Sequence, residues 1–264
     1  MLFHRILAGL LLVGLLNTFC GCRHSVYRNP DAVFQYSTLQ ALLEGVYDGE
    51  LPCGDLLSHG DLGIGTFNTL DGEMIVLDGQ CYQARSDGKI QRVAGGALTP
   101  FATVTPFDED EVLQMTQVPS IEVFTATLDK NAPNRNLPLA FRVDGTFSYM
   151  KTRSVPAQKK PYPRLADVAK RQKVTEIKNV TGTIVGFRLP QYLNGVNVAG
   201  YHMHFIDSKH RWGGHVMDFQ APGLRVALDP SAELRIVLPE TDAFAQAGLN
   251  ESKEAEVQAV ERGK

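Results

Sequence analysis

Positive charge is not in excess in this chain, because 26 lysines and arginines are outnumbered by 29 aspartates and glutamates, which gives a formal net charge of −3. Proteins that bind nucleic acid usually carry a basic surface, so nucleic acid is not expected as a partner. The sequence also lacks internal repeats and low-complexity tracts, so a repeat architecture is not expected. Hydrophobic residues make up 44% and charged residues 21%, which is ordinary for a globular protein.

Long hydrophobic runs are scarce as well. Residues 6–19 are mostly apolar, but these fourteen residues are too few to span a bilayer comfortably. They follow a short basic start and suit the apolar region of a signal peptide. We therefore expect residues 1–22 to be a signal peptide and the protein to be exported, as a periplasmic, membrane-anchored or extracellular protein. The stretch 19–22 (FCGC) resembles the cleavage box of bacterial lipoproteins, which predicts a lipid anchor on Cys22. Plain secretory cleavage and an uncleaved anchor are the alternatives.

Only four cysteines are present, and two of them, Cys20 and Cys22, belong to the predicted leader. The other two, Cys53 and Cys81, can pair in an oxidising compartment and would close a loop of about 28 residues. Two buried free thiols are an equal alternative, because the sequence does not fix the distance between their Cα atoms.

Turn-forming residues are abundant, with 24 glycines and 14 prolines among many β-branched residues, and this composition favours strands and turns. Asp-Gly pairs between apolar runs, a strong hairpin signal, stand at residues 71–72, 78–79, 87–88 and 144–145. The pattern also predicts strands at residues 121–128, 137–143 and 146–150. Short helices are expected within residues 31–47, at 165–174, from Thr241 or Asp242 to Gly248, and at 251–261.

The chain after the predicted leader, residues 30–264, is long enough for one large domain or two small ones. Residues 156–164 (PAQKKPYPR) combine prolines with basic side chains. We interpret this segment as a loop and as the approximate boundary between two β-rich halves.

Four of the seven histidines lie within the fourteen residues 202–215. In a strand, residues two apart project from the same face, so His202 and His204 are expected side by side. Turn residues follow, and His215 begins a second strand of an antiparallel pair, which brings it beside the other two. We therefore predict a metal site made by His202, His204 and His215, whereas His210 falls in the turn and is not expected to be a ligand.

Three neutral imidazoles on one sheet face are a common zinc arrangement and leave positions for a carboxylate, water or substrate. Zinc is therefore the expected metal, with iron, manganese and copper as alternatives. A lone histidine would be interpreted as a core or surface residue, but three in this geometry favour a metal.

Several blocks, in order along the chain, carry a resemblance to a known family. They are QYSTLQALL at 35–43, HGDLGIGTF at 59–67, LDGEMIVLDG at 70–79, TPFATVT at 99–105, KTRSVP at 151–156 and the histidine segment at 202–219. Together these blocks resemble the alpha-acetolactate decarboxylase family over about residues 33–264. The resemblance implies a carboxy-lyase that converts 2-acetolactate to acetoin and CO2.

The resemblance also implies that Glu73, Arg153 and Glu261 are catalytic residues beside the three histidines, with Thr66 in the same pocket. From the residues alone, Glu73 would be interpreted as an exposed hairpin residue and Arg153 as a surface charge, with Arg142 as its rival. The roles of the two glutamates, proton donor and metal ligand, are left open.

Glu261 has the weakest support in the sequence. Its alternative interpretation is a solvated glutamate in the last helical turn, and other glutamates stand nearby at positions 251, 254 and 256.

For the fold, the resemblance implies an α+β architecture with mixed β-sheet, barrel-like, in two closely packed β-rich parts with few short helices. It also implies a homodimer. Two other functions remain as alternatives: another histidine-rich β-barrel metalloenzyme, such as a cupin-like oxygenase or isomerase, and a non-catalytic periplasmic metal-binding lipoprotein.

Overall fold

The structure is a computed structural model that describes residues 31–250, 253, 256 and 257. The predicted signal peptide, its Cys22 and the predicted catalytic Glu261 lie outside the described residues, as does most of the predicted helix at 251–261. Within the described part, no helix combines the length and apolar character that crossing a membrane requires.

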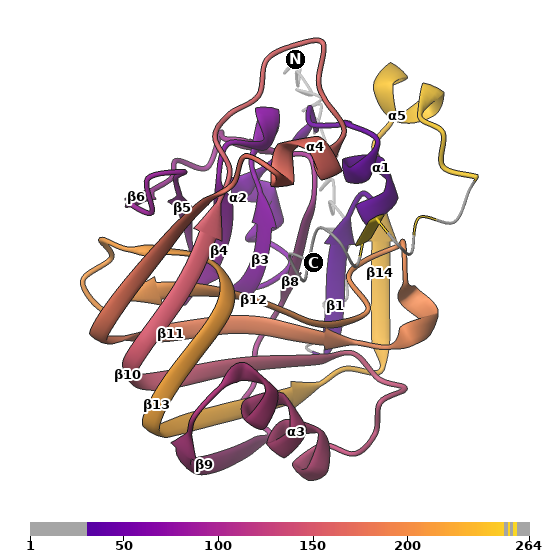
Figure 1. Cartoon of the computed structure of the whole chain (residues 1–264). Coiled ribbons are helices and arrows are strands. Elements are labelled where there is room, and N and C mark those ends of the chain that lie inside the picture. Colours follow the sequence, from indigo (N-terminus) through magenta and orange to yellow (C-terminus); the bar gives the residue numbers. More distant parts are fainter. Residues whose placement is uncertain (1–30, 251–252, 254–255, 258–264) are drawn as a thin grey trace, which may run out of the picture.

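Two β-sheets form most of the molecule (Figure 1). The first has seven strands, in the spatial order β14 (Glu233–Val237), β1 (Ala32–Tyr36), β8 (Ala102–Thr105), β3 (Leu62–Thr66), β4 (Glu73–Leu77), β5 (Gln80–Ala84) and β6 (Ile90–Arg92). Strands β1 and β14 run parallel and the other neighbours antiparallel, so this sheet is mixed. A small pair, β2 (Leu51–Pro52) and β7 (Leu98–Thr99), lies apart from it.

The second sheet curls on itself. Its five strands follow the order β10 (Leu139–Ser154), β11 (Lys173–Leu189), β12 (Gly200–Asp207), β13 (Gly213–Pro230) and β9 (Glu111–Val118). Because β10 pairs with β13 as well as with β11, the four strands β10 to β13 close into a barrel-like unit. Its interior is filled by a large apolar cluster that includes Phe141, Phe147, Phe205 and Phe219.

Helices are few and short within residues 31–250. They are α1 (Leu39–Leu43), α2 (Cys53–Leu56), α3 (Ile121–Asn131), α4 (Leu165–Ala169) and α5 (Asp242–Gln246), with single 3-10 turns at η1 (Asn68–Leu70) and η2 (Gln191–Leu193). Thr241 caps α5 through its hydroxyl, which accepts from the backbone N–H of Phe244.

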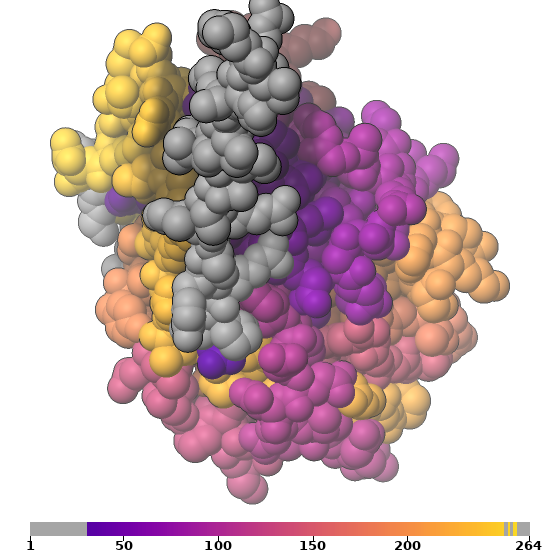
Figure 2. Space-filling view, turned by 180° about the vertical axis from the view of Figure 1, so that it is seen from behind, coloured from indigo at the N-terminus to yellow at the C-terminus, as the bar shows by residue number. Residues whose placement is uncertain are grey.

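The two sheets pack against each other through a shared apolar cluster, to which Ile64 and Ile75 of the first sheet and Val185 and Phe187 of the second contribute. Seen from behind in Figure 2, the indigo-to-magenta residues and the orange residues adjoin directly. The predicted fold class, a mixed β-sheet architecture of two closely packed β-rich parts with few short helices, is confirmed. The boundary at 156–164 stays a prediction; that segment joins β10 to α4.

The hairpin predicted at residues 78–79 is confirmed and connects β4 to β5. Asp78 and Gly79 both have positive φ, 51° and 69°, which is the backbone conformation of a tight type I′ turn. Cys53 and Cys81 are buried free thiols in the structure and belong to one apolar cluster.

The strand predicted at residues 121–128 is wrong, because this segment is the helix α3. The Ser120 hydroxyl accepts from the backbone N–H of Val123 and caps its first turn. Phe124 and Leu128, four residues apart, are both fully buried, so the apolar residues follow a helical period that the high content of β-branched residues obscured.

The hairpin predicted at residues 144–145 is also wrong, since both residues lie inside the continuous strand β10 and pair with β11. The Asp144 carboxylate accepts hydrogen bonds from Arg142 and from the Thr183 hydroxyl instead of forming a turn. The helix predicted at 165–174 is shorter than expected, because α4 ends at Ala169 and β11 begins at Lys173.

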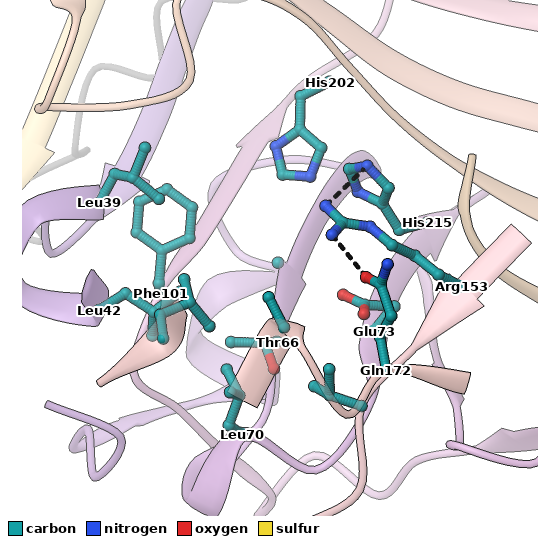
Figure 3. A pocket seen from close by; sticks show the side chains of 14 residues that line it. Leu39, Leu42, Thr66, Leu70, Glu73, Phe101, Arg153, Gln172, His202 and His215 are labelled. Atoms are coloured by element: carbon teal, nitrogen blue, oxygen red, sulfur yellow. Dashed lines mark hydrogen bonds between the residues drawn. The ribbon is translucent and has the colours of Figure 1, made fainter. Parts of the chain in front are cut away.

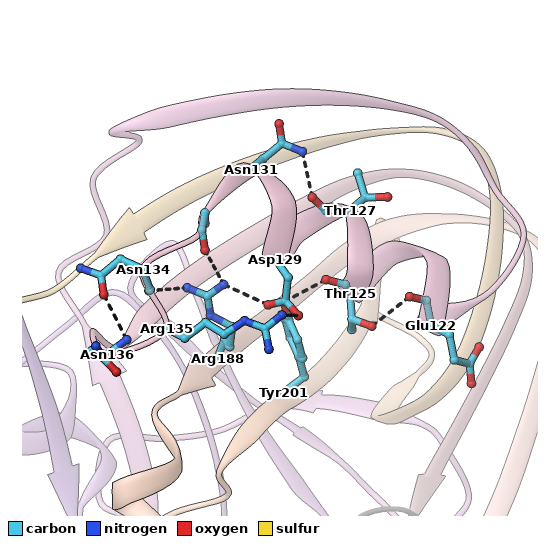
Figure 4. A network of polar contacts seen from close by, with 11 residues as sticks. Glu122, Thr125, Thr127, Asp129, Asn131, Asn134, Arg135, Asn136, Arg188 and Tyr201 are labelled. Carbon is cyan, nitrogen blue, oxygen red and sulfur yellow. Dashed lines mark hydrogen bonds and ion pairs between the residues drawn. The ribbon is translucent and has the colours of Figure 1, made fainter.

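A polar network fixes the end of α3 to the barrel (Figure 4). The Asp129 carboxylate accepts from the Tyr201 hydroxyl at 2.7 Å and from Arg188 at 3.1 Å. Arg188 also donates to the carbonyl oxygens of Ala132 and Asn134, at 2.7 and 2.8 Å, just past the helix. Because Tyr201 directly precedes His202, this network anchors the strand that carries two of the histidines.

Candidate active site

Strand register places three polar side chains in one row. His204 of β12 lies opposite His215 of β13, and His215 lies opposite Arg153 of β10. Residues directly opposite one another project from the same face of a sheet, and His202 shares that face because it is two residues from His204. A β-bulge, in which the pairing skips Met217, lies beside this row. Bulges of this kind change the direction of neighbouring side chains.

The three histidines form a compact cluster, as predicted. One ring nitrogen from each of them lies within 4.8 Å of the others, and Nε2 of His202 is 3.2 Å from Nε2 of His204. Two nitrogens bound to one tetrahedral zinc ion at about 2.05 Å are about 3.3 Å apart, so this spacing fits a shared metal. Within the described residues, it is the one group of three or more potential ligands that is arranged in this way.

Burial favours the neutral form of two of these imidazoles, His202 and His204. It lowers the pKa of His202 to about 3, with the nearby positive charge of Arg153 adding to the effect. Burial also lowers the pKa of His204 well below its ordinary value, with His202 contributing. The neutral imidazole is the form that binds a metal, so the pocket holds the ligands ready for one.

The orientation of His204 is set by the first sheet. Its Nδ1 donates to the backbone carbonyl oxygen of Met74 at 2.7 Å, and since a carbonyl only accepts, Nδ1 carries the proton. Nε2 therefore keeps its lone pair and faces His202. Outer contacts of this kind orient metal-binding histidines in other proteins.

Glu73 stands beside Met74 on β4 and approaches the cluster, with its carboxylate oxygen 3.7 Å from Nε2 of His204. Thr66 lies opposite Glu73 on β3, so both side chains point toward the same pocket (Figure 3). The Thr66 hydroxyl donates to the carbonyl oxygen of Gly72 at 2.7 Å, and this hydrogen bond stabilises the turn that precedes β4.

Arg153 is 7% exposed and projects into the pocket. Its Nη2 is 3.2 Å from Nε2 of His215, and its Nη1 donates to the side-chain oxygen of Gln172 at 2.8 Å. The rival arginine, Arg142, is placed elsewhere and forms ion pairs with Asp78 and Asp144.

The remaining wall of the pocket is apolar and comes from several elements. It includes Leu39, Leu42, Leu70, Phe101, Leu165 and Ala169. The space between this wall and the histidines, with its open mouth and the solvent there included, is about 570 Å³. Sequence reasoning missed this wall and also Gln172, since short helices in a β-rich chain carry no signal of which cavity they cover.

The chain beyond α5 returns to the same region. Val257 packs in one cluster with Leu42 and Leu165, and Glu256 forms a 3.1 Å ion pair with Arg164. Lys253 pairs with Glu44, the residue that follows α1. These contacts bring the described end of the chain next to the helices that line the pocket, four positions before Glu261.

His210 lies in the turn between β12 and β13, as expected, and packs against the ring of Tyr82 with a 4.7 Å centroid distance. It is not part of the cluster. A cluster of three imidazoles beside a carboxylate and an arginine, in a largely apolar cavity between two sheets, is typical of the active site of a metalloenzyme.

Comparisons with known proteins narrow this class to one family. A family model described as alpha-acetolactate decarboxylase matches residues 33–251. The chain is 47% identical over 232 residues to the alpha-acetolactate decarboxylase of Methanosarcina mazei, covering 88% of this chain and 81% of that protein. It is 44% identical over 238 residues to that of Methylococcus capsulatus, covering 90% and 92%.

A solved structure agrees. The crystal structure of alpha-acetolactate decarboxylase from Bacillus subtilis strain 168 matches this fold with a TM-score of 0.85 at 39% identity. The match covers 88% of this chain and 100% of that chain. The chain therefore belongs to the alpha-acetolactate decarboxylase family, as the sequence blocks predicted.

Proposed function

We propose that this chain is a metal-dependent carboxy-lyase that converts 2-acetolactate to acetoin and CO2, with Zn²⁺ held by His202, His204 and His215. Membership of the family supports the reaction. The observation that carries the metal dependence is the cluster of three imidazoles on the sheet face that also carries Arg153. When bound, the metal supplies a Lewis acid that stabilises negative charge on the substrate's oxygen atoms.

Loss of CO2 from a β-keto acid leaves an electron pair that is delocalised onto the neighbouring carbonyl oxygen. The residues around the cluster have to hold the carboxylate that leaves and to deliver a proton to the carbon that remains. Much of the pocket wall is apolar, and such surroundings lower the local dielectric and strengthen the electrostatic contacts beside it.

Arg153 is proposed to bind the substrate carboxylate. Its guanidinium offers paired N–H donors that match a carboxylate, and its position beside His215 places that carboxylate at the edge of the metal cluster. Such a clamp orients the C–C bond that breaks.

Glu73 is proposed to transfer the proton, since its carboxylate is the nearest described one to His204. Glu261 is proposed to close the site as a second carboxylate. The anchoring of Glu256 and Val257 beside the pocket supports this placement.

Export, a lipid anchor and dimerisation are further proposals. We propose that residues 1–22 direct the protein to the periplasm, the outer face of a membrane or the extracellular medium, and that Cys22 carries lipid. We also propose that the protein is a homodimer. Labelling with a radioactive fatty acid tests the anchor, and light scattering of the purified protein tests the dimer.

The reaction is tested by incubating the purified, zinc-loaded protein with racemic 2-acetolactate and measuring acetoin and CO2. Formation of both in equal amounts is expected, with half of the racemate consumed first if one enantiomer fits. Absence of acetoin would refute the proposed reaction and leave only a histidine cluster. Comparison of zinc, iron and manganese loading under air and under nitrogen tests the oxygenase alternative, which needs oxygen.

A further inference from the structure

We propose that Gln172 is a positioning residue, which holds the Arg153 guanidinium in the orientation that receives the substrate carboxylate. This inference rests on the proposed function of Arg153. Gln172 lies in the short connection between α4 and β11, and its side chain lines the pocket (Figure 3). Its Oε1 accepts from Nη1 of Arg153 at 2.8 Å. Because a guanidinium only donates, the amide oxygen must be the atom that faces it.

The guanidinium is planar, so contacts to two of its nitrogens fix its plane. Nη2 faces Nε2 of His215 at 3.2 Å, and Nη1 faces Gln172. Nε2 of His215 has one lone pair, which a bound metal would use. The contact to Gln172 does not involve that lone pair, so a bound metal would compete with the contact to His215 and not with the contact to Gln172.

The chemistry of the acceptor also matters. The Gln172 amide is neutral, so it holds Arg153 without cancelling the positive charge that attracts a carboxylate. A glutamate at this position would pair with the arginine more tightly and compete with the substrate for it. An amide in contact with a buried arginine thus orients the guanidinium without adding a negative charge of its own.

A backbone hydrogen bond fixes the position of Gln172. Its N–H donates to the carbonyl oxygen of Ala169 at 3.2 Å, which continues the last turn of α4. Leu165 and Ala169 of the same short helix line the apolar side of the pocket. One segment therefore shapes the apolar wall and orients the charged group opposite it.

The test compares three variants of the full chain. Gln172→Leu removes the acceptor at similar size, and Gln172→Glu restores an acceptor but adds a charge. The matched control is Gln158→Leu, since Gln158 accepts from the exposed Arg171 and does not line the pocket. Zinc content and thermal unfolding check that each variant is folded, and Gln172→Asn replaces Gln172→Leu if that variant fails to fold.

Two probes separate carboxylate binding from the rest of the site. One is 2,3-dihydroxy-2-methylbutanoate, which is the substrate with its ketone reduced and its carboxylate retained. The other is acetoin, the product, which has no carboxylate. Loss of a hydrogen bond to a charged group weakens binding about tenfold. We expect Gln172→Leu to weaken binding of the carboxylate probe and to raise KM for 2-acetolactate by about that factor, with acetoin binding unchanged. Gln172→Glu is expected to weaken binding of the carboxylate probe further.

Equal losses of affinity for the two probes in Gln172→Leu would overturn the positioning role. Wild-type affinity for the carboxylate probe in Gln172→Glu would also overturn it. A wild-type protein that makes acetoin, together with a Gln172→Leu variant that matches it, would refute this inference and leave the proposed function intact. A wild-type protein that makes no acetoin would refute both.

Discussion

Asp229 is a buried carboxyl whose ionisation makes stability depend on pH. It lies near the end of β13, opposite Ala140 of β10, and is 1% exposed. Burial raises its pKa from 3.8 to about 7; a hydrogen bond from the backbone N–H of Asp108 opposes the rise, and the nearby carboxylates of Asp110, Asp108 and Asp31 add to it. The folded protein therefore holds this proton more tightly than the unfolded chain.

The direction in which stability changes with pH follows from the linkage between proton binding and folding. Below pH 3.8 the carboxyl is protonated in both states, and its contribution to stability is fully present. Between pH 3.8 and about 7 the unfolded chain releases the proton and the folded protein keeps it, so stability falls as pH rises. A difference of about three pKa units, at about 1.4 kcal/mol per unit, corresponds to a loss of about 4 kcal/mol.

Urea denaturation of the wild type and of Asp229→Asn at pH 4.5, 6 and 8 measures this loss. The asparagine keeps the size and the acceptor for Asp108 but does not ionise. We expect the variant to gain stability relative to the wild type as pH rises, by up to about 4 kcal/mol at pH 8. Because other groups titrate equally in both proteins, a difference that does not change with pH would refute the reasoning.

Three further substitutions test the site and the core. Glu73→Gln is expected to lower kcat by about 100-fold or more while zinc stays bound by atomic absorption; full activity would exclude Glu73 from proton transfer. Arg153→Lys keeps the charge but loses the paired donors, so steady-state kinetics should show KM rising about tenfold, and an unchanged KM would contradict carboxylate binding by Arg153. Phe124→Ala should lower the free energy of unfolding by about 3–5 kcal/mol, because the ring is fully buried and lies 5.3 Å from that of Phe219. A loss of unfolding free energy below about 1 kcal/mol in urea titration would show that the core around position 124 repacks.

The cluster of the three histidines was predictable because strand geometry is local. Alternation along a strand fixes the shared face of His202 and His204, and a short turn brings the next strand alongside, so three histidines could be grouped without knowledge of the fold. Asp78-Gly79 was predictable for the same reason, because a tight turn depends on the φ preferences of two adjacent residues.

Long-range placement was not predictable from the residues themselves. Arg153 and His215 are 62 positions apart in the sequence and are in contact only because β10 pairs with β13. Glu73 lies near the cluster only because the two sheets pack together. Both were expected in the pocket through family resemblance alone. Asp144-Gly145 misled because a turn signal can lie inside a long strand when neighbouring side chains satisfy the aspartate.

We propose above that the cluster of His202, His204 and His215 binds the metal that the decarboxylation requires. The most direct test is to strip the purified protein with a chelator, add zinc stepwise and follow acetoin formation from 2-acetolactate, with His204→Ala as the control. Activity is predicted to be absent after stripping, to rise linearly with zinc and to stop rising at one ion per chain, and the variant is predicted to stay inactive. Full activity in the stripped protein, or in His204→Ala without zinc, would contradict the claim.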